Sequence, residues 1–290
     1  MPELLISGLV MGSIYALLAL AINIIYSTTG IINFAHGELV MLGGMFGLVL
    51  VVNTGLPLAV GIVVAGGIIA VLAVVLYYST IKPFGDNLGG SLGWLMATLG
   101  AGIIFRNVAM LIWGSHPRPF PPLGGTELIN IFGVNILPHE IWVLVITFLI
   151  AIFFNVVLDK TILGSAIKAT ASNRNTTRLM GISAEKMVLA CFGMSGAVAA
   201  VAGFLISPIT FAGPEMTVSI GLKGFGAAII GGLGSSRGAF VGGLILGILE
   251  ALSMTVITPG YKDAIVFLVM ILTITIKPEG IFNVAYEKKV

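Results

Sequence analysis

The chain has 290 residues, of which 58% are apolar and 9% are charged. Soluble domains average about 45–50% apolar and about 25% charged residues, so the composition excludes a soluble globular protein and indicates a polytopic membrane protein. The formal net charge of +2 is too small to indicate a nucleic-acid partner. The single cysteine, Cys191, excludes an internal disulfide and provides no metal-site spacing.

Apolar runs of roughly 20 residues recur along the chain, each long enough to cross the hydrocarbon core of a bilayer, about 30 Å thick, as a helix. We predict an all-α integral membrane protein, a polytopic helical bundle with one transmembrane domain over residues 1–290. The first run lacks the preceding basic residues of a signal peptide, so we expect it to be retained. Nine spans are predicted, with eight as the alternative count, at 4–26, 39–52, 57–79, 92–113, 140–158, 187–207, 218–233, 238–258 and 263–277.

The distribution of Lys and Arg predicts the orientation of these spans. With the amino terminus outside and the carboxyl terminus in the cytoplasm, ten basic residues fall inside and only Arg118 and Lys262 outside. Basic residues concentrate in cytoplasmic loops, so this orientation is favoured. The inner residues are Lys82, Lys160, Lys168, Arg174, Arg178, Lys186, Arg237, Lys277, Lys288 and Lys289.

The segment 27–38, Ser-Thr-Thr-Gly-Ile-Ile-Asn-Phe-Ala-His-Gly-Glu, interrupts the first two apolar runs. It is too polar for hydrocarbon, yet without it the next span has only about 14 residues. Irregular backbone at membrane depth is tolerated where protein or water covers its N–H and C=O groups. We therefore predict a broken helix facing the protein interior, with Asn33, His36 and Glu38 as its notable polar groups. The alternative is an ordinary cytoplasmic turn with His36 and Glu38 in solvent.

Two loops differ from the rest of the chain. The outer loop at 114–139 is rich in Pro and Gly, so it is expected to be a stiff, irregular cap that serves either as a connector or as a docking surface. The inner loop at 159–186 contains the longest polar and basic stretch of the chain, from Ser165 to Ser183. Read from its residues alone, this loop is either a solvated basic connector or a surface bound by a water-soluble partner.

Glycines recur at three- and four-residue spacing in the last third of the chain. Such spacing flattens one helix face and lets backbones approach closely, so we predict a tight hairpin of two helices. Lys223 and Glu250 lie at similar distances from its turn. Because an isolated charge in a bilayer is costly, we expect them to form an ion pair, with separate contacts to the outer headgroups as the alternative. The glycines expected to pack are Gly231, Gly234, Gly238, Gly242, Gly243 and Gly247.

The sequence lacks the motifs of an ATP-hydrolysing enzyme. No Gly-Lys dipeptide occurs, which excludes the phosphate-binding loop of a P-loop ATPase. Three histidines and one cysteine without an H-E-x-x-H motif give no pattern for metal or nucleophilic catalysis. We predict a chain that is not an enzyme and holds no metal or cofactor, so energy for moving a solute would come from a partner.

Three stretches carry a resemblance to a known family. They are Gly8–Leu20, Gly30–Glu38 with its Asn-Phe-Ala-His-Gly-Glu motif, and the Gly-rich block Gly221–Leu252. Together they resemble the H-type permease subunit of bacterial branched-chain amino acid importers of the ATP-binding cassette class. The resemblance extends from about residue 5 to Gly280.

This resemblance implies a multi-pass protein of the bacterial inner membrane. Its partners would be the lipid bilayer, a second homologous permease, two cytoplasmic ATPases that hold ATP and Mg, and a periplasmic solute-binding protein. The loop at 159–186 would be the coupling element that contacts an ATPase. Two departures, Asn173 and Asn175 in place of acidic residues and Thr177 in place of Ala, put a shared salt-bridge scheme in doubt. The coupling residues would be Lys168, Arg174, Asn175, Arg178 and Gly181.

The resemblance also implies alternating access along a path between two permeases. The candidates to line that path are Asn33, His36, Thr98 and Asn107. For Asn107 and its neighbour Arg106, the alternative is that the side chains extend to the membrane interface. The expected solute is a branched-chain or other apolar amino acid, then urea or amides, then aromatic acids. A self-sufficient secondary transporter or channel is the alternative of another class.

Overall fold

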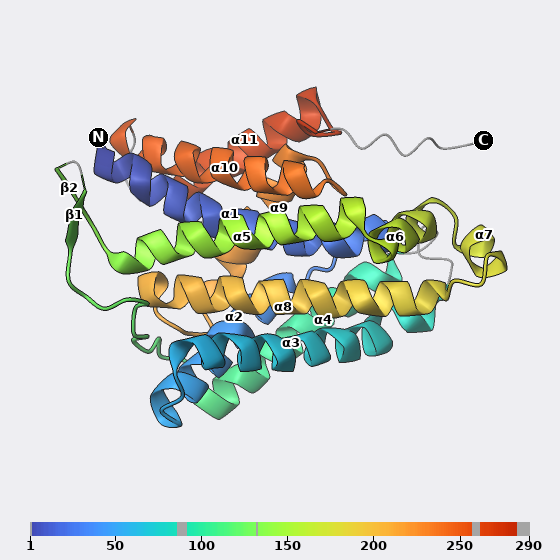
Figure 1. The fold of residues 1–290 in the computed structure, drawn as a ribbon, viewed down its shortest axis with the longest axis horizontal. Coiled ribbons are helices and arrows are strands. Elements are labelled where there is room, and N and C mark those ends of the chain that lie inside the picture. Colours follow the sequence, from blue (N-terminus) through green and yellow to red (C-terminus); the bar gives the residue numbers. More distant parts are fainter. Residues whose placement is uncertain (1, 86–91, 132, 257–261, 283–290) are drawn as a thin grey trace.

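The computed structural model describes residues 2–85, 92–131, 133–256 and 262–282 (Figure 1). This part of the chain is an all-α bundle with one short antiparallel hairpin, β1 (Ile129–Ile131) and β2 (Val134–Ile136). Lys288 and Lys289, predicted on the inner side, lie outside the described residues. The helices are α1 (Pro2–Thr29), α2 (His36–Leu48), α3 (Leu58–Thr80), α4 (Gly93–Trp113), α5 (Pro138–Lys160), α6 (Ile162–Ser172), α7 (Arg174–Leu179), α8 (Ala184–Thr210), α9 (Met216–Gly231), α10 (Ser236–Val256) and α11 (Lys262–Ile276).

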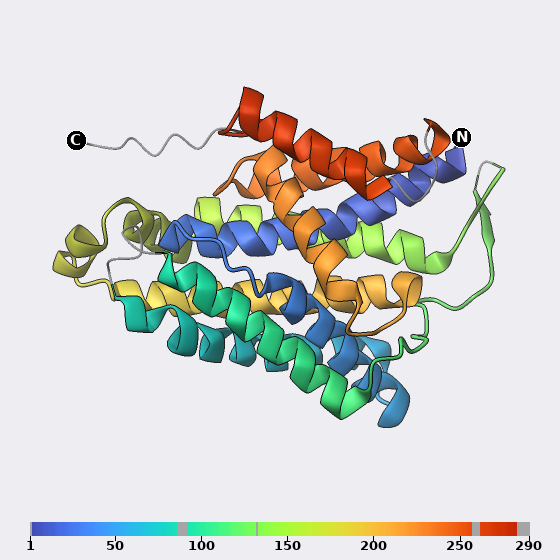
Figure 2. The ribbon, with the colours of Figure 1, turned by 180° about the vertical axis from the view of Figure 1, so that it is seen from behind.

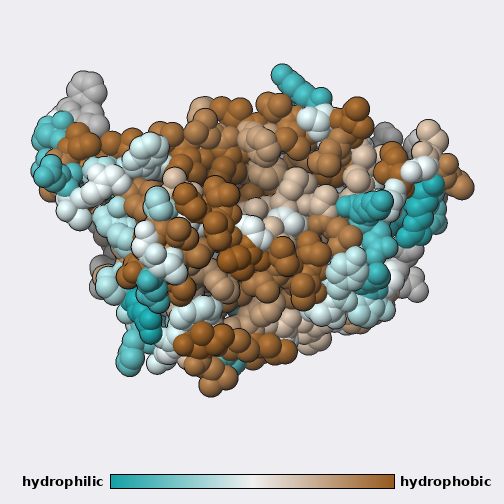
Figure 3. All heavy atoms as spheres, turned by 60° about the horizontal axis from the view of Figure 1, so that its bottom comes forward, coloured by the Kyte–Doolittle hydropathy of each residue, from teal (hydrophilic) through white to brown (hydrophobic). Residues whose placement is uncertain are grey.

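The predicted class, an all-α polytopic membrane protein, is confirmed. Within the described residues, seven helices are long and apolar enough to cross a membrane. The predicted spans at 218–233 and 263–277 correspond to α9 and α11, which have 16 and 15 residues and fall below that length. Figure 3 shows apolar side chains across the middle of one face and hydrophilic side chains at its two ends, as expected of a protein in a bilayer.

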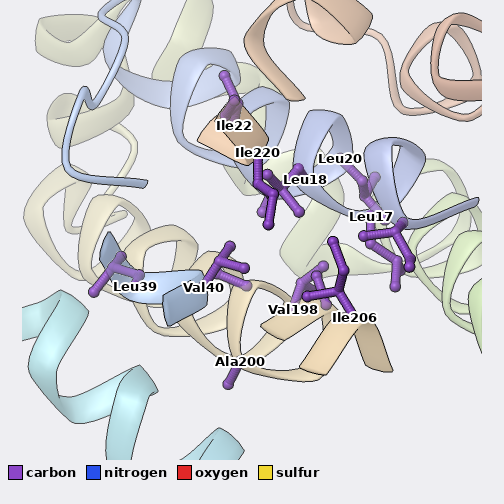
Figure 4. Close-up of a cluster of buried hydrophobic side chains, with 14 of the residues drawn as sticks. Leu17, Leu18, Leu20, Ile22, Leu39, Val40, Val198, Ala200, Ile206 and Ile220 are labelled. Carbon is purple, nitrogen blue, oxygen red and sulfur yellow. The ribbon is translucent and has the colours of Figure 1, made fainter. Parts of the chain in front are cut away.

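Helix α1 is the centre of the bundle. Its side chains from Ile14 to Ile25 are almost all buried, so the helix is apolar on every side rather than amphipathic. It packs against α5, α8, α9 and α10. In Figure 4, Leu17, Leu18 and Leu20 of α1 meet apolar side chains of α2, α8 and α9. Contacts with α1 therefore fix the positions of α5, α8, α9 and α10, whereas α3, α4 and α11 pack outside them against α2, α8, α9 and α10.

The predicted break in the first hydrophobic region is present. Helix α1 ends at Thr29, residues 30–35 are irregular, and α2 begins at His36. Figure 2 shows this connection entering the bundle, with α2 starting part of the way along it. His36 is 2% exposed, so the alternative of a solvated turn is wrong for this residue. Helix α2 extends through a π-helical turn, Val49–Asn53.

Small residues bring α2 close to the helices that cover the break. Gly43 of α2 packs against the backbone of Ala200 in α8, and Gly203 of α8 packs against Val40. On the other side, Gly37 of α2 faces Gly221 of α9, where an added Cβ on Gly37 would lie 2.6 Å from Thr217 O. Helices with such contacts shield the irregular backbone from lipid.

The glycines predicted to pack in one hairpin divide between two contacts. Gly231 and Gly238 face each other across the α9–α10 hairpin, and Gly242 faces the backbone of α9 as well. Gly243 and Gly247 instead contact α1, with Gly247 against Gly12. Gly234 lies in the turn with a φ of 86°, a conformation that glycine adopts without strain. The α1–α10 contact was not part of the sequence prediction.

The predicted irregular cap contains a β-hairpin that the sequence analysis missed. Val134 and Ile136 are buried and Asn135 is exposed, the alternation of a half-covered strand. A further pair of backbone hydrogen bonds joins Arg118 to Ala212, beyond the end of α8. These contacts hold the segment against the end of the bundle opposite α6 and α7 (Figure 1).

Gly247→Ala tests the α1–α10 contact. A Cβ at this position would overlap the backbone of Gly12, so we expect the free energy of unfolding to fall by about 1–3 kcal/mol, the usual cost of overpacking. The measurement is thermal unfolding of the purified protein in one detergent. Gly67→Ala in α3 is the matched control, because nothing lies within 4 Å of its added Cβ. Equal transition temperatures for the two variants would contradict the packing assignment.

Candidate functional site

A pocket of about 180 Å³ lies where the chain breaks between α1 and α2. Its walls come from the connection and first turn of α2, from α9, and from α4; Figure 2 shows α2 between these two helices. The lining side chains include Asn33, His36 and Glu38 on the polar side and apolar residues on the other, namely Ile22, Ile32, Phe34, Leu99, Val218, Leu222 and Phe225. These three residues and Thr217, which also lines the pocket, thus place polar groups within an otherwise apolar region.

Two buried side chains in the pocket have polar atoms without a hydrogen-bond partner. The Oδ1 atom of Asn33 accepts from the backbone N–H of Ala35 at 3.0 Å, but its Nδ2 has no partner. His36 Nε2 lies 2.8 Å from Ser195 Oγ, and the Ser195 hydroxyl donates to Ala21 O at 2.6 Å. Because that hydroxyl has one proton, Nε2 must be the donor to Ser195. In the neutral ring, Nδ1 is then an acceptor, and it too has no partner.

Glu38 is the charged group of the pocket. It lies in the first turn of α2, where the helix dipole favours a carboxylate. An added Cβ on Gly102 of α4 would lie 3.1 Å from its carboxylate, so the side chain fills the space that this glycine leaves. No ion pair of Glu38 is formed within the described part of the chain. Arg106, one turn further along α4, is paired with Glu215 at 3.1 Å.

The four residues predicted to line the path are only partly brought together. Asn33 and His36 share the pocket. Thr98 is buried in α4 and donates to Leu95 O at 3.0 Å. Asn107 is exposed on α4 and donates to Ile103 O at 2.7 Å. The pocket therefore contains two of the candidates, whereas the other two bond to their own helix.

The predicted coupling loop forms two short helices, α6 and α7, that project from one end of the bundle (Figure 1). Asn175 and Arg178 are exposed on α7. Directly after them, Leu179 and Met180 are 87% and 77% exposed. Gly181 follows with a φ of 80°, which allows the chain to turn sharply. Two apolar side chains at the tip of a polar projection are typical of a contact surface.

The projecting segment is tied to three helices of the bundle. Lys168 of α6 pairs with Asp159 of α5 at 2.8 Å, and Asp159 also pairs with Arg237 of α10 at 3.0 Å. Arg174 donates to Thr28 O at the end of α1 at 3.4 Å. A displacement of α6 or α7 is thereby opposed by contacts with α1, α5 and α10.

Asn173 and Thr177, two of the three residues that depart from the family pattern, have local roles in α7. Asn173 precedes α7, and its side chain accepts from the backbone N–H groups of Asn175 and Thr176, both at 3.0 Å. An acidic residue would perform the same capping. Thr177 is buried and donates to Asn173 O at 2.8 Å. Both side chains form hydrogen bonds within α7. The helix is therefore preserved without an acidic residue at position 173 and without an alanine at position 177.

The expected ion pair between Lys223 and Glu250 is present, with 2.7 Å between Nζ and Oε1. Two partners were not predicted. Tyr15 of α1 donates to Glu250 Oε2 at 2.7 Å, and Asp263 of α11 lies 2.8 Å from the Lys223 ammonium. Lys223 and Glu250 are both buried, so these contacts join α1, α9, α10 and α11 through charge.

Asn23 is a buried residue that the sequence analysis missed. Its Nδ2 donates to Gly232 O and Ser235 O at 3.1 and 2.9 Å, and its Oδ1 accepts from Gly234 N–H at 3.2 Å. The side chain thus holds the α9–α10 turn against α1. The signal in the sequence was an amide within an apolar run. Among the described residues, no group of three or more His, Cys, Asp or Glu could hold a metal ion.

Comparisons with known proteins point to one family. A protein-family model described as a permease component of the branched-chain amino acid transport system matches residues 4–274. The chain is 32% identical to the high-affinity branched-chain amino acid transport system permease protein BraD of Pseudomonas aeruginosa, over the whole of both chains. It is 30% identical to the corresponding LivH protein of Escherichia coli K12, covering 98% of this chain and 96% of that protein.

Two further likenesses are more distant. The chain is 25% identical to the ribose import permease protein RbsC of Escherichia coli K12, over 91% of this chain and 82% of that protein. Among solved structures, PsaBC from Streptococcus pneumoniae in complex with Fab aligns with a TM-score of 0.50 and 12% identity, over 94% of this chain and 91% of that one. At this identity the structural match supports the fold alone.

Lys223→Met tests the buried charge cluster. The change leaves Glu250 buried without its cation, so we expect the free energy of unfolding to fall by about 3–5 kcal/mol. The double variant Lys223→Met/Glu250→Met removes both charges and should recover part of the loss. Both variants are compared by thermal unfolding in detergent and by abundance in the membrane. A double variant that is less stable than the single one would contradict the assignment.

Proposed function

The chain belongs to the permease-component family of the branched-chain amino acid transport system, and on that premise we propose that it is the membrane permease of an ATP-binding cassette importer for branched-chain amino acids. The observation that carries the proposal is the family match over residues 4–274, which includes both the polar pocket and the projecting segment. The relatives that share about 30% identity over nearly the whole chain are amino acid permeases, whereas the ribose permease is more distant.

The energy for transport would come from partner subunits. We propose that two cytoplasmic ATPases, a second homologous permease and a periplasmic binding protein complete the importer, with ATP and Mg held by the ATPases. The α6–α7 segment is the proposed contact with an ATPase. Its support is the exposed pair Leu179 and Met180, flanked by polar side chains, on a projection tied to α1, α5 and α10.

The proposed location is the inner membrane, with the amino terminus outside. The cluster of basic residues around the projecting segment supports this orientation. Lys82, Arg174 and Arg178 line one pocket at that end of the bundle, and Lys168 and Arg237 line a second. Because basic residues favour the cytoplasmic side, the α6–α7 end faces the cytoplasm, where an ATPase would be.

The proposed mechanism is alternating access. The binding protein delivers the solute at the outer end, and ATP closes the ATPase pair against α6 and α7. The ion pairs of Lys168, Asp159 and Arg237 then pass the displacement to α5 and α10. The path between the two permeases would be lined by Asn33 and His36 from the pocket, together with Thr98 and Asn107 of α4.

Leu179→Asp tests the proposed coupling contact. The variant places a charge on the apolar tip of the projection, so we expect at least about a tenfold loss of ATPase co-purification and of leucine uptake. The assay uses cells that lack the chromosomal copy and carry the wild-type or variant gene, at equal membrane abundance. Leu128→Asp is the matched control, because Leu128 is 61% exposed at the opposite end.

The control variant should retain ATPase co-purification. Arg178→Glu should resemble Leu179→Asp, since it replaces a cation of the same surface by an anion. Full uptake by both variants would support a self-sufficient transporter and contradict the proposal. If the wild-type gene restores no leucine uptake in a strain that depends on it, the solute assignment fails, and urea, amides and aromatic acids are tested next.

A further inference from the structure

The pocket at the chain break combines features that the family membership does not explain. Asn33, His36 and the carboxylate of Glu38 lie within a region where a lone charge is costly. Asn33 and His36 are each 2% exposed, yet Nδ2 of Asn33 and Nδ1 of His36 have no partner. Burying an unpaired polar atom costs about 1–3 kcal/mol, and such atoms are rare among buried residues, so two of them in the lining of one pocket call for an explanation.

The polar atoms without partners indicate which hydrogen-bond donors and acceptors a ligand of this pocket would have. Nδ1 of His36 is an acceptor, because Nε2 donates to Ser195. Glu38 supplies negative charge and further acceptors, and it has no ion pair within the described residues. Asn33 Nδ2 is a donor. The polar side of the pocket therefore matches a group with several N–H donors and a positive charge, beside a group that accepts one hydrogen bond.

The rest of the pocket is hydrocarbon. Ile22, Ile32 and Phe34 come from the α1–α2 region, and Leu222 and Phe225 come from α9. The volume of about 180 Å³ suits a small molecule rather than a peptide. The pocket opens between α9 and α4, where Leu222 and Leu99 are each 40% exposed. It is thus reachable from the surface of the bundle between these two helices.

We propose that this pocket is a binding site for an α-amino acid with an apolar side chain, in which Glu38 and Nδ1 of His36 receive the ammonium group and Nδ2 of Asn33 donates to the carboxylate. The proposal rests on the proposed transport function and names the site and the groups that would select the solute within the membrane. The apolar walls receive the side chain. A solute without an ammonium group would leave Glu38 without a cation in direct contact, and the site would disfavour it.

The first test is leucine uptake by cells that carry Glu38→Gln. The amide keeps the size of the side chain and removes its charge, so we expect the maximal rate to fall by at least about tenfold, the equivalent of one charge-assisted hydrogen bond. The concentration for half-maximal uptake should change little, because the binding protein sets it. Glu38→Asp should retain more of the rate than Glu38→Gln.

The matched control for uptake is Glu127→Gln, which removes an exposed carboxylate far from the pocket in sequence. Membrane abundance and ATPase co-purification are measured for each variant, so that a misfolded protein is recognised. A Glu38→Gln variant that transports leucine at the wild-type rate would overturn the proposal and leave the proposed function intact.

The second test measures ligand binding in the pocket directly, without a transport assay. Leu222→Cys in a Cys191→Ala background is treated with a maleimide in the purified importer, with and without a ligand. Leucine should slow modification by at least about fivefold under near-saturating conditions, whereas 4-methylpentanoate, which lacks the ammonium group, and urea should not. Adding Glu38→Gln should abolish the protection. Leu128→Cys, outside the pocket, should react equally in every case.

The two proposals can fail separately. If the wild-type importer moves no leucine and leucine does not protect Leu222→Cys, both the solute and the site assignment are wrong. If leucine is transported but 4-methylpentanoate protects as well as leucine does, the transport function stands and the ammonium site is overturned. Protection by urea alone would also overturn it.

Discussion

Backbone N–H and C=O groups cannot be left unpaired in hydrocarbon, and the bundle is organised around the place where the helical hydrogen bonds between α1 and α2 are interrupted. Residues 30–35 are irregular within the bundle, so other helices must cover them. Glycines at α2–α8 and α2–α9 contacts allow that cover to be close. The central helix α1 then packs against the same helices and against α10. A covered break is also what creates a polar pocket among apolar walls.

Ion pairs connect helices in the interior of the bundle and at the end that carries α6 and α7. The Lys223–Glu250 pair, with Tyr15 and Asp263, joins four helices. At the end of the bundle that carries α6 and α7, Asp159 of α5 pairs with Lys168 of α6 and with Arg237 of α10. Helix α10 takes part in both clusters and also packs against α1 by glycine contacts. Movement of the projecting segment can therefore reach the helices around the pocket through a short series of direct contacts.

The sequence predicted features that depend on polarity and on the depth of a residue in the membrane. It missed features that depend on which side of a helix faces which neighbour. The break at residues 27–38 followed from its polarity, and the Lys223–Glu250 pair followed from equal distances to one turn. Hydropathy does not specify which side of α10 faces which neighbour, so Gly243 and Gly247 were assigned to the wrong contact. The bonds of Ser195 to His36 and of Asn23 to the α9–α10 turn required tertiary structure. Proline and glycine predicted turns in the outer loop but not its β-hairpin.

The central claim is that the pocket at the chain break lies on the transport path. It is tested most directly by Val218→Cys, in a Cys191→Ala background, in the full importer reconstituted in vesicles. Val218 lines the pocket and is 52% exposed in the isolated chain. We predict that a membrane-impermeant thiol reagent modifies this cysteine from one side without nucleotide and from the opposite side with trapped ATP. Modification from neither side in either state would place the residue against lipid and contradict the account.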